Sequence, residues 1–412
     1  MDQTKPAHQE FLWHFGECRQ NSNLDRCLSI CLGSHTEKEA QYPGKPLHNF
    51  ANIERLGFRK HPGATATYGN NRGRGNLRSS KPVEFILVFF LPFLFFINYN
   101  TKPMHKKISV IGAGNVGATT AELIARDGFA DVVLYDVHEG IAKGKALDIS
   151  EACSLWSSPV SVIGTASFID TADSDIIIIT AGFPRKPGMS RDDLLHANAG
   201  VIKEVTEGTV RQSPNSIIIV VTNPMDVMAY TALQVSGFDH RRIIGMRGVL
   251  DSARFRTFVA LELGVSSQDI EALVLGGHGD QMVPLPRFTT VKGIPITELL
   301  HANDVNRIIE RTRSGGAEIV GLLKTGSAFY APAAATVQMV RAILFDERRL
   351  LPCSAYLDGE YGIAGLFVGV PVVLGGKGVE KIIALELTKD EKSIFDRSVT
   401  AVRTMIDMLK SS

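Results

Sequence analysis

The main body of the chain alternates short unbroken apolar runs with longer segments whose apolar residues recur at helical spacing. The apolar runs lie at 108–111, 132–135, 176–179 and 217–221. Continuous Ile and Val runs are typical of strands that are buried on both faces, as in a parallel sheet. Segments with helical spacing, such as 118–126, separate them. This alternation predicts an α/β fold with a Rossmann-type, doubly wound parallel sheet.

After Gly245 the pattern changes to mixed helices and short strands. The chain ends in a segment with one apolar face, and Thr388-x-x-Glu391 forms a capping box that predicts the start of a helix. We therefore expect a Rossmann domain over 104–247, followed by a second, α+β domain over 248–412.

The first 103 residues do not match this pattern. Residues 1–80 lack sustained periodicity and are rich in Asn, Gly, His, Arg and Gln, so we expect them to be disordered. Residues 85–97 form an apolar run interrupted by Pro92. This run is shorter than the roughly 20 residues that span a bilayer. It also lies too far from the start for a signal peptide and lacks a small-residue cleavage site.

Three interpretations of this run compete: a membrane tether, a targeting segment, or no functional part of the mature protein. We favour the third, because Met104 is followed at once by a good first strand. The hypothesis is that Met104 is the true start and that 1–103 is upstream sequence read in frame. N-terminal mass spectrometry of protein from its native source would test it, and a mature chain beginning near Met1 would contradict it.

Composition excludes several classes of protein. With 44% hydrophobic and 21% charged residues, the chain reads as an ordinary globular protein. Residues 1–103 carry a net charge of +5 and the remainder carries −4, so the main body gives no reason to expect nucleic-acid binding. The five cysteines include no Cys-x-x-Cys pattern, which argues against a zinc site and a disulfide framework. We expect no metal and a reducing, cytoplasmic location.

A glycine-rich motif follows the first predicted strand and opens the first predicted helix. Asp136 ends the next strand, as a dinucleotide site requires. The helix N-terminus would offer N–H groups to the pyrophosphate, and Asp136 would accept hydrogen bonds from ribose hydroxyls and repel a 2′-phosphate. The motif thus predicts NAD as the cofactor. Its residues are Gly112, Ala113, Gly114, Asn115, Val116 and Gly117.

Four further clusters carry candidate chemistry. Arg185 and Arg191 lie in a Pro- and Gly-rich loop after the run at 176–179, where fixed charges suit a small dianion. Asn223 follows the run at 217–221, at the strand end where open sheets bind ligands. The remaining two are Asp251-Ser252-Ala253-Arg254, at the start of a predicted helix, and His278 among three glycines. Taken singly, each could be a turn residue, a loop histidine or a surface charge. Their joint occurrence after the glycine motif argues against those interpretations.

In this order the motifs resemble the lactate/malate dehydrogenase superfamily, and within it the bacterial malate dehydrogenases most similar to lactate dehydrogenase. The resemblance covers about 104–412 and leaves 1–103 unmatched. It implies NAD-dependent oxidation of (S)-malate to oxaloacetate, a dicarboxylate as small-molecule partner and a homo-oligomer, with no nucleic acid or membrane. The motifs that carry it are Gly112–Gly117, Leu134-Tyr135-Asp136, the Arg185/Arg191 loop, Val221-Thr222-Asn223-Pro224, Leu250-Asp251-Ser252-Ala253-Arg254 and Gly277-His278-Gly279-Asp280.

The resemblance also implies roles for single residues. His278 would be the acid/base, and Asp251 would hold its other ring nitrogen. Arg254 would bind the C1 carboxylate, and Arg191 would polarise the C2 oxygen. The segment 184–188 would act as a lid. The resemblance also assigns cofactor contacts to Asn198, Val221, Thr222 and Asn223. Asn223 would contact the substrate as well.

Arg185 decides between relatives within the family. The resemblance places it against the third carbon of the substrate, where lactate dehydrogenases carry glutamine. An arginine buried against a methyl group would be unpaired, at a cost of roughly 3–5 kcal/mol, so Arg185 indicates a second carboxylate. Ala328, where the lactate enzymes place a threonine, fits this expectation. The alternatives are an L-lactate dehydrogenase and a non-enzymatic protein that reuses the scaffold; the second would be expected to lack His278, Asp251 or Arg254.

Overall fold

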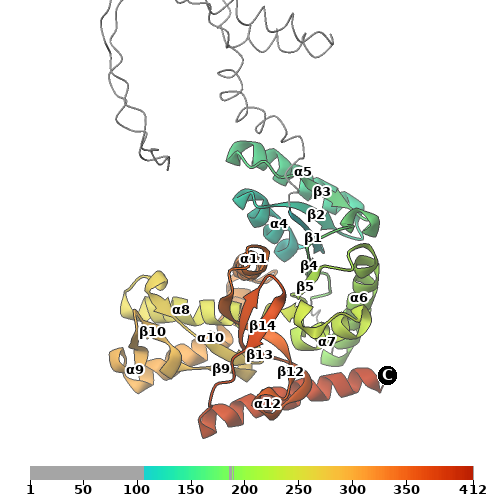
Figure 1. Cartoon of the computed structure of the whole chain (residues 1–412). Helices are drawn as coiled ribbons and strands as arrows, with labels where there is room; N and C mark the ends of the chain where they lie inside the picture. The colour runs from blue at the N-terminus through green and yellow to red at the C-terminus, as the bar shows by residue number, and fades with distance from the viewer. Residues whose placement is uncertain (1–105, 185–187, 189, 412) are drawn as a thin grey trace, which may run out of the picture. The chain divides into compact units, whose positions relative to one another are not determined.

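The computed structural model describes residues 106–184, 188 and 190–411 of the 412-residue chain. The predictions for 1–103, among them the disorder of 1–80 and the three interpretations of 85–97, lie outside these residues. So does the prediction for Arg185. Everything below concerns the described residues, which Figure 1 shows in colour.

The first half of the fold is a six-stranded parallel arrangement in the order β3-β2-β1-β4-β5-β6. All four predicted apolar runs are strands, and the last ends at Val220, one residue earlier than its run. The predicted doubly wound parallel sheet is confirmed. The strands are β1 (Lys106–Ile111), β2 (Ala130–Tyr135), β3 (Val162–Thr165), β4 (Ile176–Ile179), β5 (Ile217–Val220) and β6 (Ile243–Gly245).

Helices connect these strands and cover the sheet. The burial pattern of β4 and β5 explains their composition, since every Ile and Val of both strands is buried. Because water is excluded on both faces, these strands carry no polar residue. The connecting helices are α4 (Asn115–Asp127), α5 (Glu139–Trp156), α6 (Arg191–Gln212) and α7 (Met225–Ser236), with short 3-10 turns at Phe168–Thr171 and His240–Arg242.

The second half continues the same sheet with antiparallel strands, in the order β6-β12-β13-β8-β9, with β14 also paired to β13. Gly245 of β6 lies opposite Ser354 of β12, and Gly276 of β8 lies opposite Gly369 of β13. A separate small sheet has the order β11-β10-β7. The strands are β7 (Ile270–Glu271), β8 (Val274–Gly276), β9 (Met282–Pro284), β10 (Thr290–Val291), β11 (Ile294–Pro295), β12 (Arg349–Asp358), β13 (Ala364–Gly375) and β14 (Gly378–Ile382).

Five helices accompany these strands within the described part of the chain. In Figure 1, α8 to α10 lie together beside the small sheet, and α12 runs along the end of the long strands. The predicted capping box is present, since Thr388 and Glu391 exchange hydrogen bonds at the start of α12. The helices are α8 (Val249–Leu263), α9 (Ile296–Leu299), α10 (Ala302–Leu323), α11 (Tyr330–Leu344) and α12 (Lys389–Lys410).

Two apolar clusters form the core. The larger one runs from the parallel strands through β12 and β13 to α12, and therefore spans both halves of the sheet. The smaller one lies between α8, α10 and the small sheet, around Phe255 and Ile270. Because α8 contributes residues to both clusters, such as Leu250 and Phe255, the packing of the second half fixes this helix on two sides.

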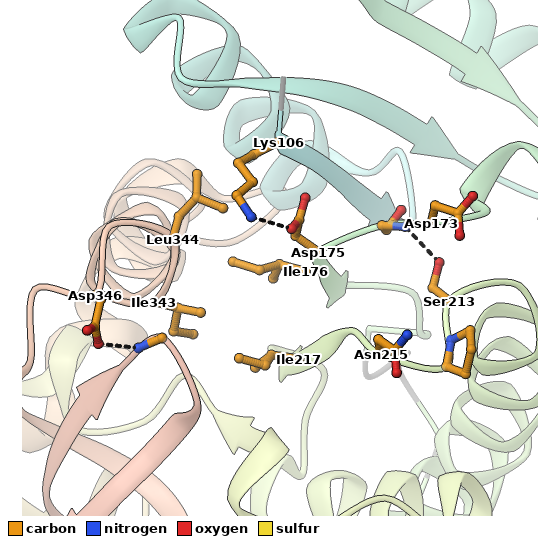
Figure 2. Close-up of a pocket in the computed structure, with 13 residues that line it drawn as sticks. Lys106, Asp173, Asp175, Ile176, Ser213, Asn215, Ile217, Ile343, Leu344 and Asp346 are labelled. Atoms are coloured by element: carbon orange, nitrogen blue, oxygen red, sulfur yellow. Dashed lines mark hydrogen bonds and ion pairs between the residues drawn. The ribbon is translucent and has the colours of Figure 1, made fainter. Parts of the chain in front are cut away.

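The amino ends of β1, β4 and β5 border a cavity of about 420 Å³ (Figure 2). Its charged groups are largely engaged: Lys106 binds Asp175 at 2.8 Å, and Asp346 accepts the amide N–H of Gly376 at 2.8 Å. An open parallel sheet binds ligands at the opposite, carboxyl ends of its strands. The predicted chemistry therefore lies away from this cavity.

In the part of the chain that the structure covers, none of the helices combines the length and apolar character that crossing a membrane requires. Cys153 and Cys353 are buried and unpaired, and no group of His, Cys, Asp and Glu among the described residues could hold a metal ion.

Candidate active site

The glycine motif turns the chain from β1 into α4 at the carboxyl edge of the sheet. Gly112 has φ +107°, and a Cβ there would lie 2.7 Å from the amide nitrogen of Ala181. A Cβ on Gly117 would lie 1.8 Å from the carbonyl oxygen of Gly112. Two of the three glycines are therefore required by the turn itself.

Gly114 is the exception, and this difference points to a ligand. A Cβ at Gly114 would meet no atom of the described residues within 4 Å. It is the N-cap of α4, and no side chain caps the helix there. The first N–H groups of α4 are thus free to bind an anion, and the absence of a side chain keeps the approach open. This arrangement fits the pyrophosphate of a dinucleotide.

Asp136 follows β2 and lies beside the glycine loop. Its two oxygens accept the amide N–H groups of Ala113 at 2.8 Å and His138 at 2.9 Å. Each oxygen keeps a lone pair, and the side chain is partly exposed, so it can still accept hydrogen bonds from ribose hydroxyls. Lys145 of α5 donates to the carbonyl oxygen of Ala113 at 2.7 Å and braces the same loop.

Asn198 joins the ends of β4 and β5. Its Oδ1 accepts the amide N–H of Phe183 at 2.7 Å, and its Nδ2 donates to the carbonyls of Phe183 at 3.2 Å and Asn223 at 2.7 Å. The side chain is buried, so all these bonds stabilise the protein. Thr222 adds a bond from its hydroxyl to the carbonyl of Ala181 at 2.6 Å. The predicted role of Asn198 toward the cofactor stays a prediction.

His278 and Asp251 lie side by side. His278 follows β8, and its Nδ1 lies 3.0 Å from Oδ1 and 3.4 Å from Oδ2 of Asp251. The Asp251 side chain is 2% exposed, whereas that of His278 is 39% exposed. Burial raises the pKa of the Asp251 carboxyl, but His278, Arg247 and Arg254 outweigh it and bring this pKa below its ordinary value. Asp251 is thus an ionised, fixed partner, and the other ring nitrogen of His278 remains available for chemistry.

Arg254 lies one helical turn after Asp251 on α8. Its side chain is 10% exposed, with Nη1 3.5 Å from Oδ1 of Asp251. Its Nε and Nη1 have no hydrogen-bond partner among the described residues. Glycines in α10 make room for it: a Cβ on Gly316 would lie 3.6 Å from Nη2. A buried guanidinium with unpaired N–H groups suits a carboxylate ligand.

A cavity of about 300 Å³ brings together most of the residues predicted for catalysis and substrate binding. His278, Asp251, Arg254 and Asn223 line it, as do Val116 of the glycine motif and Val221. Ala328, predicted to lie near the substrate, also lines it. Arg191 does not: it is exposed at the first position of α6.

A second charged pair at this cavity was not among the predicted residues. Arg247, which lines the cavity, is bound to Asp226 of α7. Both side chains are more than nine-tenths buried. Asp226 stands three residues after Asn223, and Arg247 stands four before Asp251. Their closeness to these two motifs is the sequence feature that could have identified the pair.

Comparison with known proteins places these features in one family. The model of the lactate/malate dehydrogenase NAD binding domain matches residues 106–245, and that of the alpha/beta C-terminal domain matches residues 248–411. A malate dehydrogenase of Thermomicrobium roseum is 55% identical over 307 residues, 74% of this chain and 99% of the relative. That of Geobacillus kaustophilus is 56% identical over 307 residues, 74% of this chain and 98% of the relative.

Solved structures agree. The malate dehydrogenase of Salinibacter ruber is 51% identical, with a TM-score of 0.71, over 74% of this chain and 98% of that one. A lactate dehydrogenase of Cryptosporidium parvum, complexed with lactic acid and nicotinamide adenine dinucleotide, is 42% identical, with a TM-score of 0.72, over 75% of this chain and 99% of that one. The glycine loop, the His278–Asp251 pair and these similarities lead to one conclusion: the chain belongs to the lactate/malate dehydrogenase family.

Proposed function

We propose that this protein is an NAD-dependent malate dehydrogenase that interconverts (S)-malate and oxaloacetate. The observation that carries the proposal is one cavity lined by two groups: His278, fixed by the buried Asp251, and Arg254, whose Nε and Nη1 have no hydrogen-bond partner among the described residues. An acid/base beside a carboxylate-binding arginine is what oxidation of a 2-hydroxy acid needs. The relatives named malate dehydrogenase support the choice of malate.

His278 takes the hydroxyl proton of malate on its free ring nitrogen. Asp251 holds Nδ1 protonated, which keeps the other nitrogen unprotonated and ready to accept, and its charge stabilises the imidazolium that forms. In the reverse direction the imidazolium returns this proton to the C2 oxygen of oxaloacetate.

Arg254 binds the C1 carboxylate through the N–H groups that have no partner in the described chain. The side chain of Asn223 is exposed to the cavity and orients the substrate oxygen. We assign to Arg191 the polarisation of the C2 oxygen, as the resemblance implies, from its place at the start of α6. Together these residues hold C2 facing the cofactor side of the cavity.

The residues of the first half fit NAD. Bound NAD supplies the hydride acceptor. The free N–H groups at the start of α4 and the open space at Gly114 suit its pyrophosphate, and the spare lone pairs of Asp136 suit ribose hydroxyls and disfavour a 2′-phosphate. Thr222, Val221 and Asn198 support the same side of the cavity.

Arg185 is proposed to select malate over lactate, by pairing with the second carboxylate. The test is an assay of NADH oxidation with oxaloacetate and then with pyruvate, for the unmodified protein and for Arg185→Gln. We expect the unmodified protein to prefer oxaloacetate. In the variant, turnover of oxaloacetate should fall more than a hundredfold while turnover of pyruvate rises. A preference of the unmodified protein for pyruvate would make it a lactate dehydrogenase, the second candidate, which the lactate dehydrogenase neighbours favour.

The remaining proposals concern organisation. We assign 104–247 to NAD binding and 248–412 to substrate binding and catalysis, and we expect a homo-oligomer in the cytoplasm. Equilibrium sedimentation of the purified protein tests the assembly, and a monomer at micromolar concentration would contradict it. Cell fractionation with an antibody to the α12 segment tests the location.

A further inference from the structure

A second pair of opposite charges is buried beside the candidate active site. Asp226 lies in the first turn of α7, and Arg247 follows β6. Their side chains are 3% and 7% exposed, and Nη1 of Arg247 donates to Oδ2 of Asp226. The Ser354 hydroxyl donates to Oδ1 of Asp226 at 2.6 Å, so the carboxylate is bonded on both oxygens and held in place.

Arg247 does more than pair with Asp226. It lines the same cavity as His278 and Asp251, and its buried Nε has no hydrogen-bond partner in the described residues. Burying a guanidinium with an unpaired N–H is unfavourable, and an apolar pair could fill the same space at lower cost. A purely structural role therefore explains this position poorly.

The charges around His278 balance only when Arg247 is counted. Two carboxylates, Asp226 and Asp251, and two guanidinium groups, Arg247 and Arg254, share the wall of the cavity or lie directly behind it. Among the described residues of the other packed elements, α12 offers the hydroxyl of Ser398, near Gly277, and α10 offers Arg313, which is bound to Glu310 and to the carbonyl of Met282.

The groups interact across the two pairs. Burial raises the pKa of the Asp226 carboxyl above its usual value, while Arg247, Ser354 and His278 oppose this rise. Arg247 likewise contributes to the low pKa of Asp251, against the effect of burial. Asp226 and Asp251 are thus both within electrostatic reach of the His278 ring, and Arg247 is within reach of the His278–Asp251 pair.

We infer that Arg247 is a positioning residue for the reaction, an inference that rests on the proposed function. The positive charge of Arg247 cancels the negative charge of its buried partner Asp226, so that Asp251 alone stabilises protonated His278. The reason is chemical. His278 has to accept a proton in one direction and release it in the other, near neutral pH. Two uncompensated carboxylates would hold that proton too tightly.

The test measures the titration of His278 directly, without substrate. The full chain is labelled with ¹⁵N-histidine, and the signal of His278, one of 11 histidines, is assigned by its loss in His278→Asn. In Arg247→Met the pKa of His278 should rise by about one unit. Arg247→Lys, which keeps the charge, should titrate like the unmodified protein, and Asp226→Asn should lower the pKa.

Two further variants complete the design. If Arg247→Met does not fold, Asp226→Asn/Arg247→Met removes both charges and is expected to titrate like the unmodified protein. Arg341→Met is the matched control, because Arg341 is a half-exposed arginine on α11, 3.7 Å from Asp127. It should leave the pKa of His278 unchanged.

Kinetics give the second readout. The acid limb of the pH profile of kcat/KM for malate oxidation should move to higher pH in Arg247→Met and to lower pH in Asp226→Asn. The inference is overturned if the His278 pKa is the same in all folded variants, or if Lys and Met at position 247 shift it equally. A shift in the spectra without malate turnover in the unmodified protein would overturn the proposed function instead and leave the charge effect standing.

Discussion

At the scale of single residues, the three glycines of the loop at 112–117 have different roles. A Cβ on Gly117 would overlap the Gly112 carbonyl at 1.8 Å, whereas one on Gly114 would meet nothing within 4 Å in the part of the chain that the structure covers. Gly114→Ala should therefore fold with an unchanged melting temperature and bind NADH at least tenfold more weakly, because the methyl group occupies the space of the pyrophosphate. Fluorescence titration with NADH and thermal melting measure the two effects.

Gly117→Ala is the paired variant and should lower the melting temperature even without cofactor. If Gly114→Ala binds NADH as the unmodified protein does, the pyrophosphate does not lie at this loop.

Asp251 acts through the histidine that it holds. Asp251→Asn should lower kcat by about 10²–10⁴-fold, because the imidazolium loses its charged partner and the ring its fixed tautomer. Steady-state kinetics with oxaloacetate measure this effect, with His278→Asn as the comparison. A loss of less than about tenfold would remove Asp251 from the proposed mechanism.

Several residues that the sequence motifs singled out lie together in the fold. One cavity is lined by six of the predicted site residues and by Ala328; the six are His278, Asp251, Arg254, Asn223, Val221 and Val116. The sequence could not reveal the Arg247–Asp226 pair, because its two partners follow different strands. The β5–β6 pairing brings these strand ends together, and the β6–β12 pairing adds Ser354. Nor does spacing show that the amide of Asn198 is used up within the protein.

At the scale of elements, α12 begins with a capping box that is reinforced by a charge from outside the helix. Arg287 makes two hydrogen bonds of 3.0 Å to the two oxygens of Glu391, whose side chain is 15% exposed. Burial raises the pKa of Glu391, but the hydrogen bonds from Arg287 and the Thr388 amide lower it by more. The net pKa of Glu391 therefore lies below the ordinary value. A depressed carboxyl pKa stabilises the fold above the unfolded pKa, and this contribution is lost as the pH falls through the folded pKa.

The free energy of unfolding should therefore fall as the pH drops from about 5 toward 3, and Glu391→Gln should weaken this dependence. Glutamine can still cap the helix, so the variant removes the charge alone, at a cost of about 1 kcal/mol at neutral pH. Urea unfolding at several pH values measures it. Glu298→Gln, an exposed carboxyl on α9, is the control. Equal pH dependence in the two variants would contradict the prediction.

The parallel strands could be predicted because their apolar runs are local signals. The antiparallel strands β12 and β13 could not be located in the same way, although β13 is almost wholly buried. These two strands pair with each other, but their places in the sheet are set by β6 and β8, which pair with them at separations of about 110 and 90 residues. Such pairings depend on the register of the whole sheet. The small sheet consists of strands of two residues, too short to leave a period in the sequence.

At the scale of the whole molecule, the family match begins at residue 106 and ends at residue 411. The relatives are covered over 98–99% of their own length by about three quarters of this chain. A protein that begins at Met104 should therefore retain the kcat and melting temperature of the 412-residue chain. Parallel assays and thermal melts of the two proteins measure this, and a loss of activity on truncation would show that residues 1–103 contribute to the fold or the site.

The continuous sheet also limits how the two halves can be exchanged. The boundary between the matched domains falls at Gly245–Gly248, next to the strand that pairs across it. A Cβ on Gly245 would lie 2.7 Å from the Cβ of Ser354, and one on Gly248 would lie 2.6 Å from the carbonyl oxygen of Pro352. Chimeras that join halves of different relatives at this point will thus succeed only where the incoming β12 tolerates both glycines. The natural unit of recombination in this protein is the first half together with β12.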